Sequence, residues 1–182
     1  MSPRQDARRN RDRIVTAAAE VFRDHGATAP LGLVAERAGV GRATLYRHFS
    51  DRRALATAVL DRRVTVLVAL ADEHPGPDLL ELLLVAIWTM QSEIPGLIEA
   101  ARNQGAADLP EAPVARTRAL LADALTVAHR HGAVGPGVGL AEVYLSIAML
   151  DGVIAVRDEL PEGATVADAM GMALRALRPP GH

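Results

Sequence analysis

The stretch from Leu31 to Phe49 combines basic, hydroxyl and aromatic side chains in a pattern suited to binding nucleic acid. Apolar residues at spacings of three and four predict a short helix that ends near Ala38. Gly39 lies where a helix C-terminus favours a left-handed residue, and Gly41 is acceptable as the N-cap of a second helix, residues 42–48. Two short helices around a glycine turn are typical of a helix-turn-helix, whose second helix enters the major groove of DNA.

One side of the second helix is apolar and the other carries hydrogen-bonding groups. Leu45 and Phe49 are predicted to be buried, since they share one face of the helix. The side chains left free to contact DNA are those of Arg42, Thr44, Tyr46, Arg47 and His48. Guanidinium groups bind guanine edges or phosphates, and threonine contacts a base or a thymine methyl group. The alternative is a helical hairpin that only packs, in which Tyr46 lies partly in the core.

Residues 10–65 resemble the DNA-binding domain of the TetR family of transcriptional regulators (TetR/AcrR type). The matching pieces are residues 35–40 (AERAGV), 44–49 (TLYRHF) and 52–55 (RRAL). The resemblance implies an all-α fold, with an N-terminal three-helix helix-turn-helix DNA-binding domain and a C-terminal helical-bundle domain for regulation and dimerisation. It also implies a sequence-specific transcriptional repressor, whose operator affinity falls when a small-molecule effector binds in the C-terminal bundle.

Within the second helix, the resemblance assigns a role to each free side chain. Tyr46 and His48 would contact phosphates, and Arg47 would face the DNA. A regulator of this kind would read its operator with Arg42, Thr44 and Arg47. Because members of this family bind as dimers, the partner would be double-stranded DNA with a palindromic operator. Half-sites one helical turn apart, roughly 34–36 Å, would match the two recognition helices.

The segments that flank the two helices also bear on DNA binding. Arg52 stands where the family usually has a lysine, at the start of a fourth helix, and that lysine typically binds phosphate. The link of residues 27–30 (ATAP) departs from the family, which usually has Thr or Ser at the start of the helix that follows. Thr28 is the candidate to replace that phosphate contact.

Charge is divided unevenly along this chain of 182 residues, whose net charge is −2. Residues 1–63 contain 13 arginines and seven acidic residues, a net charge of +6. Residues 64–182 contain seven arginines and 15 acidic residues, a net charge of −8. A basic N-terminal part joined to an acidic remainder indicates that only the first part meets a polyanion such as DNA.

Helix breakers and apolar periodicity divide the chain into a DNA-binding domain and a larger C-terminal domain. The predicted boundaries are 10–55 for the first domain, 51–72 for the linking fourth helix, 56–178 for the second domain, and 1–9 and 179–182 for flexible tails. The predicted first helix spans residues 10–25 and packs behind the helix-turn-helix. By resemblance, a shift of the linking helix would change the spacing of the two recognition helices in a dimer.

The second domain is predicted to be a helical bundle. A helix over residues 78–92, apolar on nearly all sides, is suited to its centre. Further helices are predicted over 97–103, 114–131, 140–159 and 165–177, with a loop at 104–113. By resemblance, residues 140–159 and 165–177 would form a four-helix bundle with a second copy, making a homodimer. The alternative is that their apolar faces pack inward in a monomer.

A ligand pocket is expected inside this bundle. Its two aromatic residues, Trp88 and Tyr144, lie on helices predicted to be central. With Leu83 and Met149 they would line a cavity for a small, largely apolar effector. Ordinary core packing is the alternative for each of them.

Asp151 is a separate candidate for ligand contact. It lies on the apolar stripe of its helix, and a buried acid needs a partner. That partner would be a ligand, an arginine such as Arg116 or Arg118, or the second copy in a dimer.

Several classes of function lack their usual residues in this sequence. It contains no cysteine, so thiol chemistry is excluded and a reducing cytoplasm is the expected location. No apolar run approaches the roughly 18 residues of a membrane span. An enzyme would need a metal site, nucleophile or cofactor motif, and none is found. The remaining alternative is a helical interaction protein without operator binding, which only the unusual segment 27–33 favours.

Overall fold

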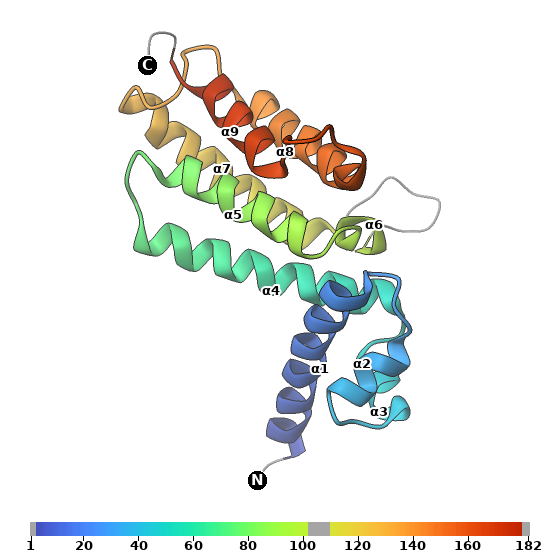
Figure 1. Ribbon diagram of the computed structural model, residues 1–182. Helices are drawn as coiled ribbons and strands as arrows, with labels where there is room; N and C mark the ends of the chain where they lie inside the picture. The colour runs from blue at the N-terminus through green and yellow to red at the C-terminus, as the bar shows by residue number, and fades with distance from the viewer. Residues whose placement is uncertain (1–2, 102–109, 180–182) are drawn as a thin grey trace. The chain divides into compact units, whose positions relative to one another are not determined.

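The computed structural model describes residues 3–101 and 110–179, and these residues form helices and connecting loops without a β-strand among them (Figure 1). The predicted all-α fold is therefore confirmed. The helices are α1 (Pro3–His25), α2 (Leu31–Arg37), α3 (Arg42–His48), α4 (Arg52–Glu73), α5 (Leu79–Glu93), α6 (Leu97–Ala101), α7 (Glu111–Arg130), α8 (Leu140–Ala155), the 3₁₀ helix η1 (Arg157–Glu159) and α9 (Val166–Leu177). Within the described ranges, no helix is both long and apolar enough to span a lipid bilayer.

The chain divides into two compact units, which meet within α4. The first unit comprises the described residues of Met1–Arg63 and Glu93–Val114, and the second those of Val64–Ser92 and Ala115–His182. The sequence predicts the change of domain after residue 55 and assigns everything beyond it to the second domain. The structure differs because Ile94, Leu97 and Ala101 are buried in the core of the first unit.

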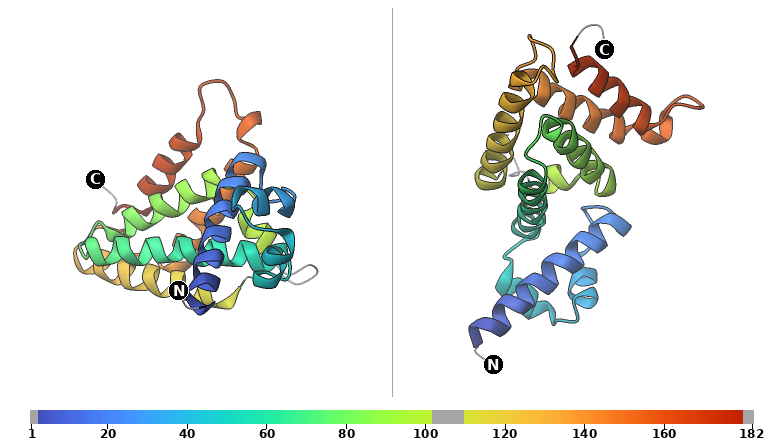
Figure 2. Two further views of the ribbon diagram at one scale, coloured as in Figure 1. Left: turned by 90° about the horizontal axis from the view of Figure 1, so that it is seen from below. Right: turned by 90° about the vertical axis from the view of Figure 1, so that its left-hand side faces the viewer.

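The first unit is built around α1. Helix α2 packs on α1, and α3 packs on α2, as the views in Figure 2 also show. Residues from five helices and the turn before α6 form one apolar core, which includes Ile14, Val21, Phe22, Val34, Ala35, Leu45, Phe49, Leu55, Val59, Ile94 and Leu97. Burying a side chain such as Phe22 or Leu45 contributes about 1.5–3 kcal/mol, so this core holds the two short helices in place.

The second unit is a helical bundle with its own apolar core. Leu83, Leu84 and Trp88 of α5 are fully or almost fully buried, as are Leu121 of α7 and Val143 of α8. The predicted central position of residues 78–92 is confirmed by this burial. Helices α8 and α9 lie side by side in Figures 1 and 2 and are in contact.

Two helices begin earlier than the sequence predicts. Helix α1 starts at Pro3, so residues 3–9 are helical and not a flexible tail. Proline suits the first turn of a helix, Asp6 complements the helix dipole there, and alanine and arginine are good helix formers. Helix α7 starts at Glu111, before the predicted residue 114, because Pro113 needs no hydrogen-bond donor in the first turn.

Parts of the predicted tails and loop lie outside the described residues. These are residues 1–2, 180–182 and 104–109. The predicted helix over 140–159 ends at Ala155 and is followed by the 3₁₀ helix η1. The predicted helix over 165–177 begins at Val166, with Thr165 as its N-cap.

Candidate nucleic-acid interface

The turn between α2 and α3 has the geometry that its glycines predict. Gly39 has a φ of +62°, a left-handed conformation that other residues rarely adopt. Its N–H donates to the carbonyl of Glu36, and the N–H of Val40 donates to the carbonyl of Ala35, which closes the end of α2. Gly41 is the N-cap of α3, in an extended conformation. The predicted roles of Gly39 and Gly41 are therefore confirmed.

Helix α1 braces this turn. Arg13 Nη2 donates a hydrogen bond of 2.7 Å to the carbonyl oxygen of Ala38. A Cβ atom placed on Gly39 would lie 2.8 Å from the same Arg13 nitrogen, so the glycine also leaves room for the guanidinium. The last carbonyl of α2, which has no partner in its own helix, is thereby satisfied.

Helix α3 is anchored by its apolar side, as predicted. Leu45 is 1% exposed and Phe49 is 3% exposed, and both belong to the core of the first unit. The guanidinium of Arg11 lies 5.0 Å above the Phe49 ring, which covers that ring with a cation from α1. Because the apolar side of α3 is buried in this core, its remaining side chains face away from the core.

The outward side of α3 carries the predicted contact residues. Arg42, Tyr46 and Arg47 are exposed, whereas Thr44 and His48 are half-buried. Tyr46 is 54% exposed, so the alternative of partial core packing for this residue is wrong. Arg47 Nη2 donates to the Thr44 hydroxyl at 3.1 Å, which places these two predicted base-contacting side chains together.

Arg52 occupies an unexpected position. Its Nη1 donates to the carbonyl oxygen of Ala27 at 2.8 Å and to that of Ala29 at 2.6 Å. The guanidinium thus holds the link before α2, whose N-cap, Pro30, offers no side-chain cap. Thr28 lies on the same link and is exposed. The sequence resemblance assigns Arg52 to phosphate, and no local pattern reveals these contacts across more than 20 residues of sequence.

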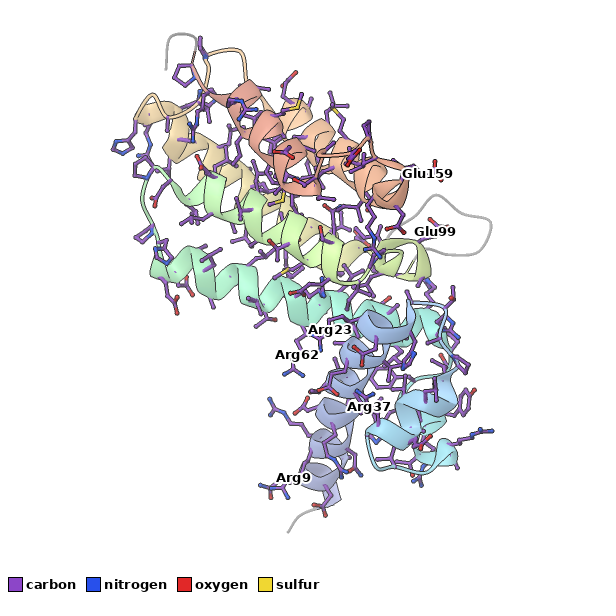
Figure 3. The ribbon with its side chains drawn as sticks, viewed as in Figure 1. Arg9, Arg23, Arg37, Arg62, Glu99 and Glu159 are labelled. Atoms are coloured by element: carbon purple, nitrogen blue, oxygen red, sulfur yellow. The ribbon has the colours of Figure 1, made fainter. Side chains whose placement is uncertain are left out.

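Further arginines are exposed on the first unit beyond α3. Figure 3 shows Arg9 and Arg23 on α1 and Arg62 on α4, all exposed. Arg62 Nη1 donates to the Thr16 hydroxyl, and Arg23 Nε lies 3.9 Å from Asp24 Oδ1. Arg37 of α2 forms ion pairs with Glu20 and Asp24 at 3.3 and 3.5 Å. The basic groups left for a polyanion are therefore fewer than the sequence count suggests.

Asp51 caps the N-terminus of α4. Its Oδ1 accepts a hydrogen bond of 2.8 Å from the backbone N–H of Ala54, and its Oδ2 accepts one of 3.1 Å from the Ser50 hydroxyl. The bond from Ala54 is the main reason that the pKa of the Asp51 carboxyl lies below its usual value. The hydrogen bond from Ala54 identifies Asp51, and not Ser50, as the N-cap of α4.

This cap gives the first testable expectation. A carboxyl whose folded pKa is lowered stabilises the fold above its unfolded pKa of about 3.9, and this contribution is lost as the pH falls through the folded value. Asp51→Ala is therefore expected to lower the free energy of unfolding by about 1 kcal/mol at pH 7 and by less at pH 3. Urea unfolding at both pH values measures this loss of stability. The control is Asp123→Ala, because Asp123 is exposed on α7. A loss that is equal at both pH values would contradict this role.

The predicted ligand residues of the second unit lie in two different environments. Leu83 and Trp88 are fully buried, and Tyr144 packs against the same core. Met149 is 71% exposed, and Asp151 is also exposed. Asp151 is therefore not buried within its own chain, because the side of α8 that carries it does not pack into the bundle. A partner from a second copy stays a prediction.

Three polar atoms of the second unit are buried without a hydrogen-bond partner among the described residues. They are Trp88 Nε1, Gln91 Oε1 and the Tyr144 hydroxyl. Leaving such a group unpaired costs about 1–3 kcal/mol, so each is a position where a ligand atom or water would be stabilised. Gln91 was missed by the sequence reasoning, although it lies three residues after Trp88, on the same side of α5.

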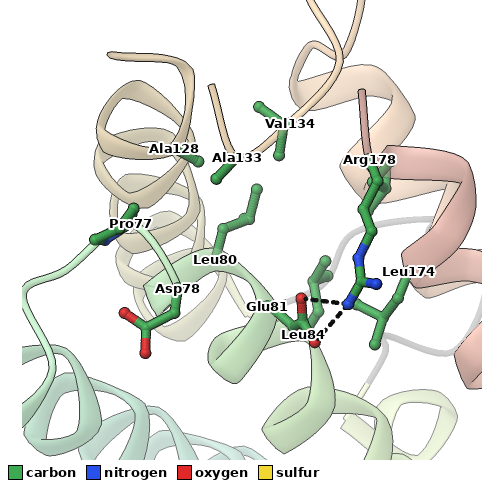
Figure 4. Close-up of a pocket in the computed structure, with 11 residues that line it drawn as sticks. Pro77, Asp78, Leu80, Glu81, Leu84, Ala128, Ala133, Val134, Leu174 and Arg178 are labelled. Carbon is green, nitrogen blue, oxygen red and sulfur yellow. Dashed lines mark hydrogen bonds and ion pairs between the residues drawn. The ribbon is translucent and has the colours of Figure 1, made fainter. Parts of the chain in front are cut away.

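A separate pocket of about 230 Å³ lies where the start of α5, the end of α7 and the end of α9 meet (Figure 4). Its walls are mainly apolar, as with Leu80 and Leu174, and Arg178 Nη2 lies 3.3 Å from Glu81 Oε2 at its edge. None of the predicted ligand residues lines it. No pattern in the sequence joins Glu81 to Arg178, which are 97 residues apart.

Helices α8 and α9 carry large apolar side chains that this chain does not cover. On α8, Leu145, Met149 and Val156 are 59%, 71% and 44% exposed and share one side of the helix or its extension. On α9, Met172 is 64% exposed. We call these four residues the α8–α9 apolar surface. Exposed apolar surface of this kind marks sites of protein association.

The two-unit fold and the outward side of α3 together indicate which class of protein this is. A helix-turn-helix with a basic, exposed second helix, followed by a helical bundle, is the architecture of a DNA-binding regulator. Residues 14–59 match the family described as "Bacterial regulatory proteins, tetR family". The HTH-type transcriptional activator FasR of Mycolicibacterium smegmatis is 45% identical over 60 residues, which cover 32% of this chain and 27% of FasR.

Solved structures extend the similarity over both units. The TetR transcription regulatory protein from Mycobacterium vanbaalenii is 31% identical, with a TM-score of 0.63, covering 87% of this chain and 99% of that protein. A second structure, described as the molecular basis for control of antibiotic production by bacterial hormones, is 26% identical. It has a TM-score of 0.67 and covers 98% of this chain and all of that one. The chain belongs to the TetR family of bacterial transcriptional regulators.

Proposed function

We propose that the chain is a homodimeric transcriptional repressor that binds a palindromic operator and is not an enzyme. The observation that carries this proposal is the division of α3 into a buried apolar side and an outward side with Arg42, Thr44 and Arg47. These three side chains would read base edges in the major groove. The site of action would be the cytoplasm, where the bacterial operator is.

Contacts to the DNA backbone would come from the edges of the same surface. Tyr46 and His48 of α3 and Thr28 of the preceding link would donate hydrogen bonds to phosphates. Arg52 would act mainly by holding that link in place, since its Nη1 is bonded to two carbonyl oxygens. Affinity should fall steeply as salt is raised, because phosphate contacts release counterions.

The α8–α9 apolar surface would join two copies of the chain. Packing of α8 and α9 against their symmetry mates would cover Leu145, Met149 and Met172 in a four-helix bundle. The same association would give Asp151 a partner from the second copy. A dimer matches a palindromic operator, because its two-fold axis relates both recognition helices and both half-sites.

An effector would bind within the second unit and lower operator affinity. Its polar atoms would pair with Trp88 Nε1, Gln91 Oε1 and the Tyr144 hydroxyl. The rest of the effector would be small and largely apolar, because Leu83 and its neighbours are apolar. The similarity to a structure concerned with bacterial hormones supports a small signalling molecule. Trp88 is the single tryptophan, so its fluorescence reports binding. A tight effector that left operator affinity unchanged would defeat this mechanism.

Selection of bound sequences from a random pool of duplex DNA tests the central proposal. The full chain at about 0.15 M salt is expected to enrich a palindrome with half-sites roughly 34–36 Å apart. Placing that sequence at a promoter with a reporter then distinguishes a repressor from an activator. A chain that dimerises but enriches no sequence would instead be a helical interaction protein without operator binding.

Arg47→Ala tests the reading of bases by α3. The substitution removes an exposed guanidinium group whose one hydrogen bond in the described structure is to Thr44, so the fold should be unaffected. Operator affinity is expected to fall about tenfold or more, since a bidentate arginine contact contributes about 1–3 kcal/mol of discrimination. Arg130→Ala, at the exposed end of α7, is the matched control. Unchanged affinity and sequence preference in Arg47→Ala would exclude this residue from readout.

A further inference from the structure

Gly32 of α2 and Arg42 of α3 are in close approach. A Cβ atom placed on Gly32 would lie 2.9 Å from Arg42 Nη2 and 3.4 Å from both Arg42 Cζ and Arg42 Nε. Three atoms of the guanidinium therefore lie close to the place that a side chain at position 32 would occupy. Any residue larger than glycine would displace the end of the Arg42 side chain.

The backbone gives no other reason for glycine at this position. Gly32 lies within the first turn of α2 and does not have the positive φ that favours glycine elsewhere in this chain. Glycine inside a helix is unfavourable relative to alanine because it loses more conformational entropy on folding. The feature that distinguishes position 32 is the space it leaves for Arg42.

The Arg42 guanidinium is otherwise available for DNA. Among the described residues, it makes no hydrogen bond or ion pair with another side chain, and the residue is exposed at the N-terminus of α3. A long flexible side chain loses rotamer freedom when it binds. A guanidinium that already rests against α2 has fewer rotamers to lose when it binds.

We propose that Gly32 is a specificity-determining residue for operator binding, because it provides the space in which the Arg42 guanidinium rests against α2. This inference builds on the proposed function, in which Arg42 contacts a base. Gly32 has no side chain to bind a base, so its proposed effect on specificity acts through Arg42. Its effect should therefore be seen in affinity and sequence preference, and not as a loss of fold.

A double-mutant cycle on the full chain tests the proposal, with the selected operator as the probe. Gly32→Ala is expected to lower operator affinity about fivefold or more. This loss corresponds to part of the binding free energy that one bidentate arginine contact contributes. Its melting temperature should be unchanged or higher, because alanine favours the helix. Arg42→Ala should lower the affinity at least as much. In the Arg42→Ala background, Gly32→Ala should then change the affinity less than twofold.

Gly137→Ala is the matched control, since a Cβ there meets no atom within 4 Å and the residue belongs to the second unit, whereas α3 belongs to the first. Its operator affinity should stay within about twofold of the unmodified chain. The inference is overturned if Gly32→Ala keeps full affinity and preference, or if its loss is just as large without Arg42. Failure of the unmodified chain to bind any operator would instead defeat the proposed function.

Discussion

Met149→Asp is expected to convert the dimer into a monomer and to lower operator affinity at least a hundredfold. Met149 is 71% exposed at the centre of the α8 side that also carries Leu145 and Val156. Burying an aspartate against apolar side chains of a second copy would leave its charge without a partner. The substituted residue stays in solvent in the single chain, so each monomer should fold normally.

The large loss in DNA binding follows from the linkage of two half-site contacts. When two binding modules are joined, the second contact forms at a high effective concentration and the affinity rises about 10²–10⁴-fold. Separated monomers lose that gain, although each keeps an intact α3. Analytical ultracentrifugation and operator titration of the same sample measure the two effects together.

Val66→Asp is the matched control for this experiment. Val66 lies on α4 and is 55% exposed, so it resembles Met149 in polarity and exposure but lies outside the α8–α9 apolar surface. The control should remain a dimer with full operator affinity. A Met149→Asp variant that stays dimeric at micromolar concentration would place the interface elsewhere.

Arg52→Ala is expected to lower the free energy of unfolding by about 2–3 kcal/mol. Its Nη1 donates to the carbonyl oxygens of Ala27 and Ala29, and hydrogen bonds from charged groups contribute about 1.5–3 kcal/mol. Ala27 and Ala29 are both 4% exposed, so water cannot freely replace the lost donor. Urea unfolding followed by circular dichroism measures the change.

The neighbouring residue provides the control for Arg52. Arg53 is exposed on the first turn of α4, and its replacement by alanine should change stability by less than about 0.5 kcal/mol. If the two variants are equally stable, Arg52 does not hold the link. A variant of Arg52 with normal stability but a reduced salt dependence of DNA binding would restore the phosphate role that the sequence resemblance assigns to it.

The helix-turn-helix was predictable because its determinants are local. A left-handed glycine at 39, an N-cap at 41 and apolar residues three or four apart act within one or two turns of helix. The same short-range rules correctly assign Leu45 and Phe49 to the core and the basic groups of α3 to the surface. The early starts of α1 and α7 also agree with a local rule, because each helix has a proline in its first turn.

The side chains that α8 buries were hard to predict because this helix is apolar on two faces. Leu150 and Ile154 pack into the bundle, whereas Leu145 and Met149 are exposed. A helix that is apolar on opposite sides has no periodicity that distinguishes the face for its own core from a face for a second copy. Asp151 lies on an apolar stripe in the sequence, but it is exposed on α8 in the single chain.

Local pattern and the family resemblance were sufficient for the all-α class and the position of the second helix of the helix-turn-helix, and composition was sufficient for the basic character of the first 63 residues. Only tertiary packing decided that Arg52 binds two backbone carbonyls, that α6 joins the first core and that Arg42 rests against Gly32. These contacts join residues at least 10 positions apart in the sequence, and their geometry depends on how whole helices pack. Short-range rules govern one helix and its caps, whereas the partner of a long side chain is set by which helices the shared core brings together.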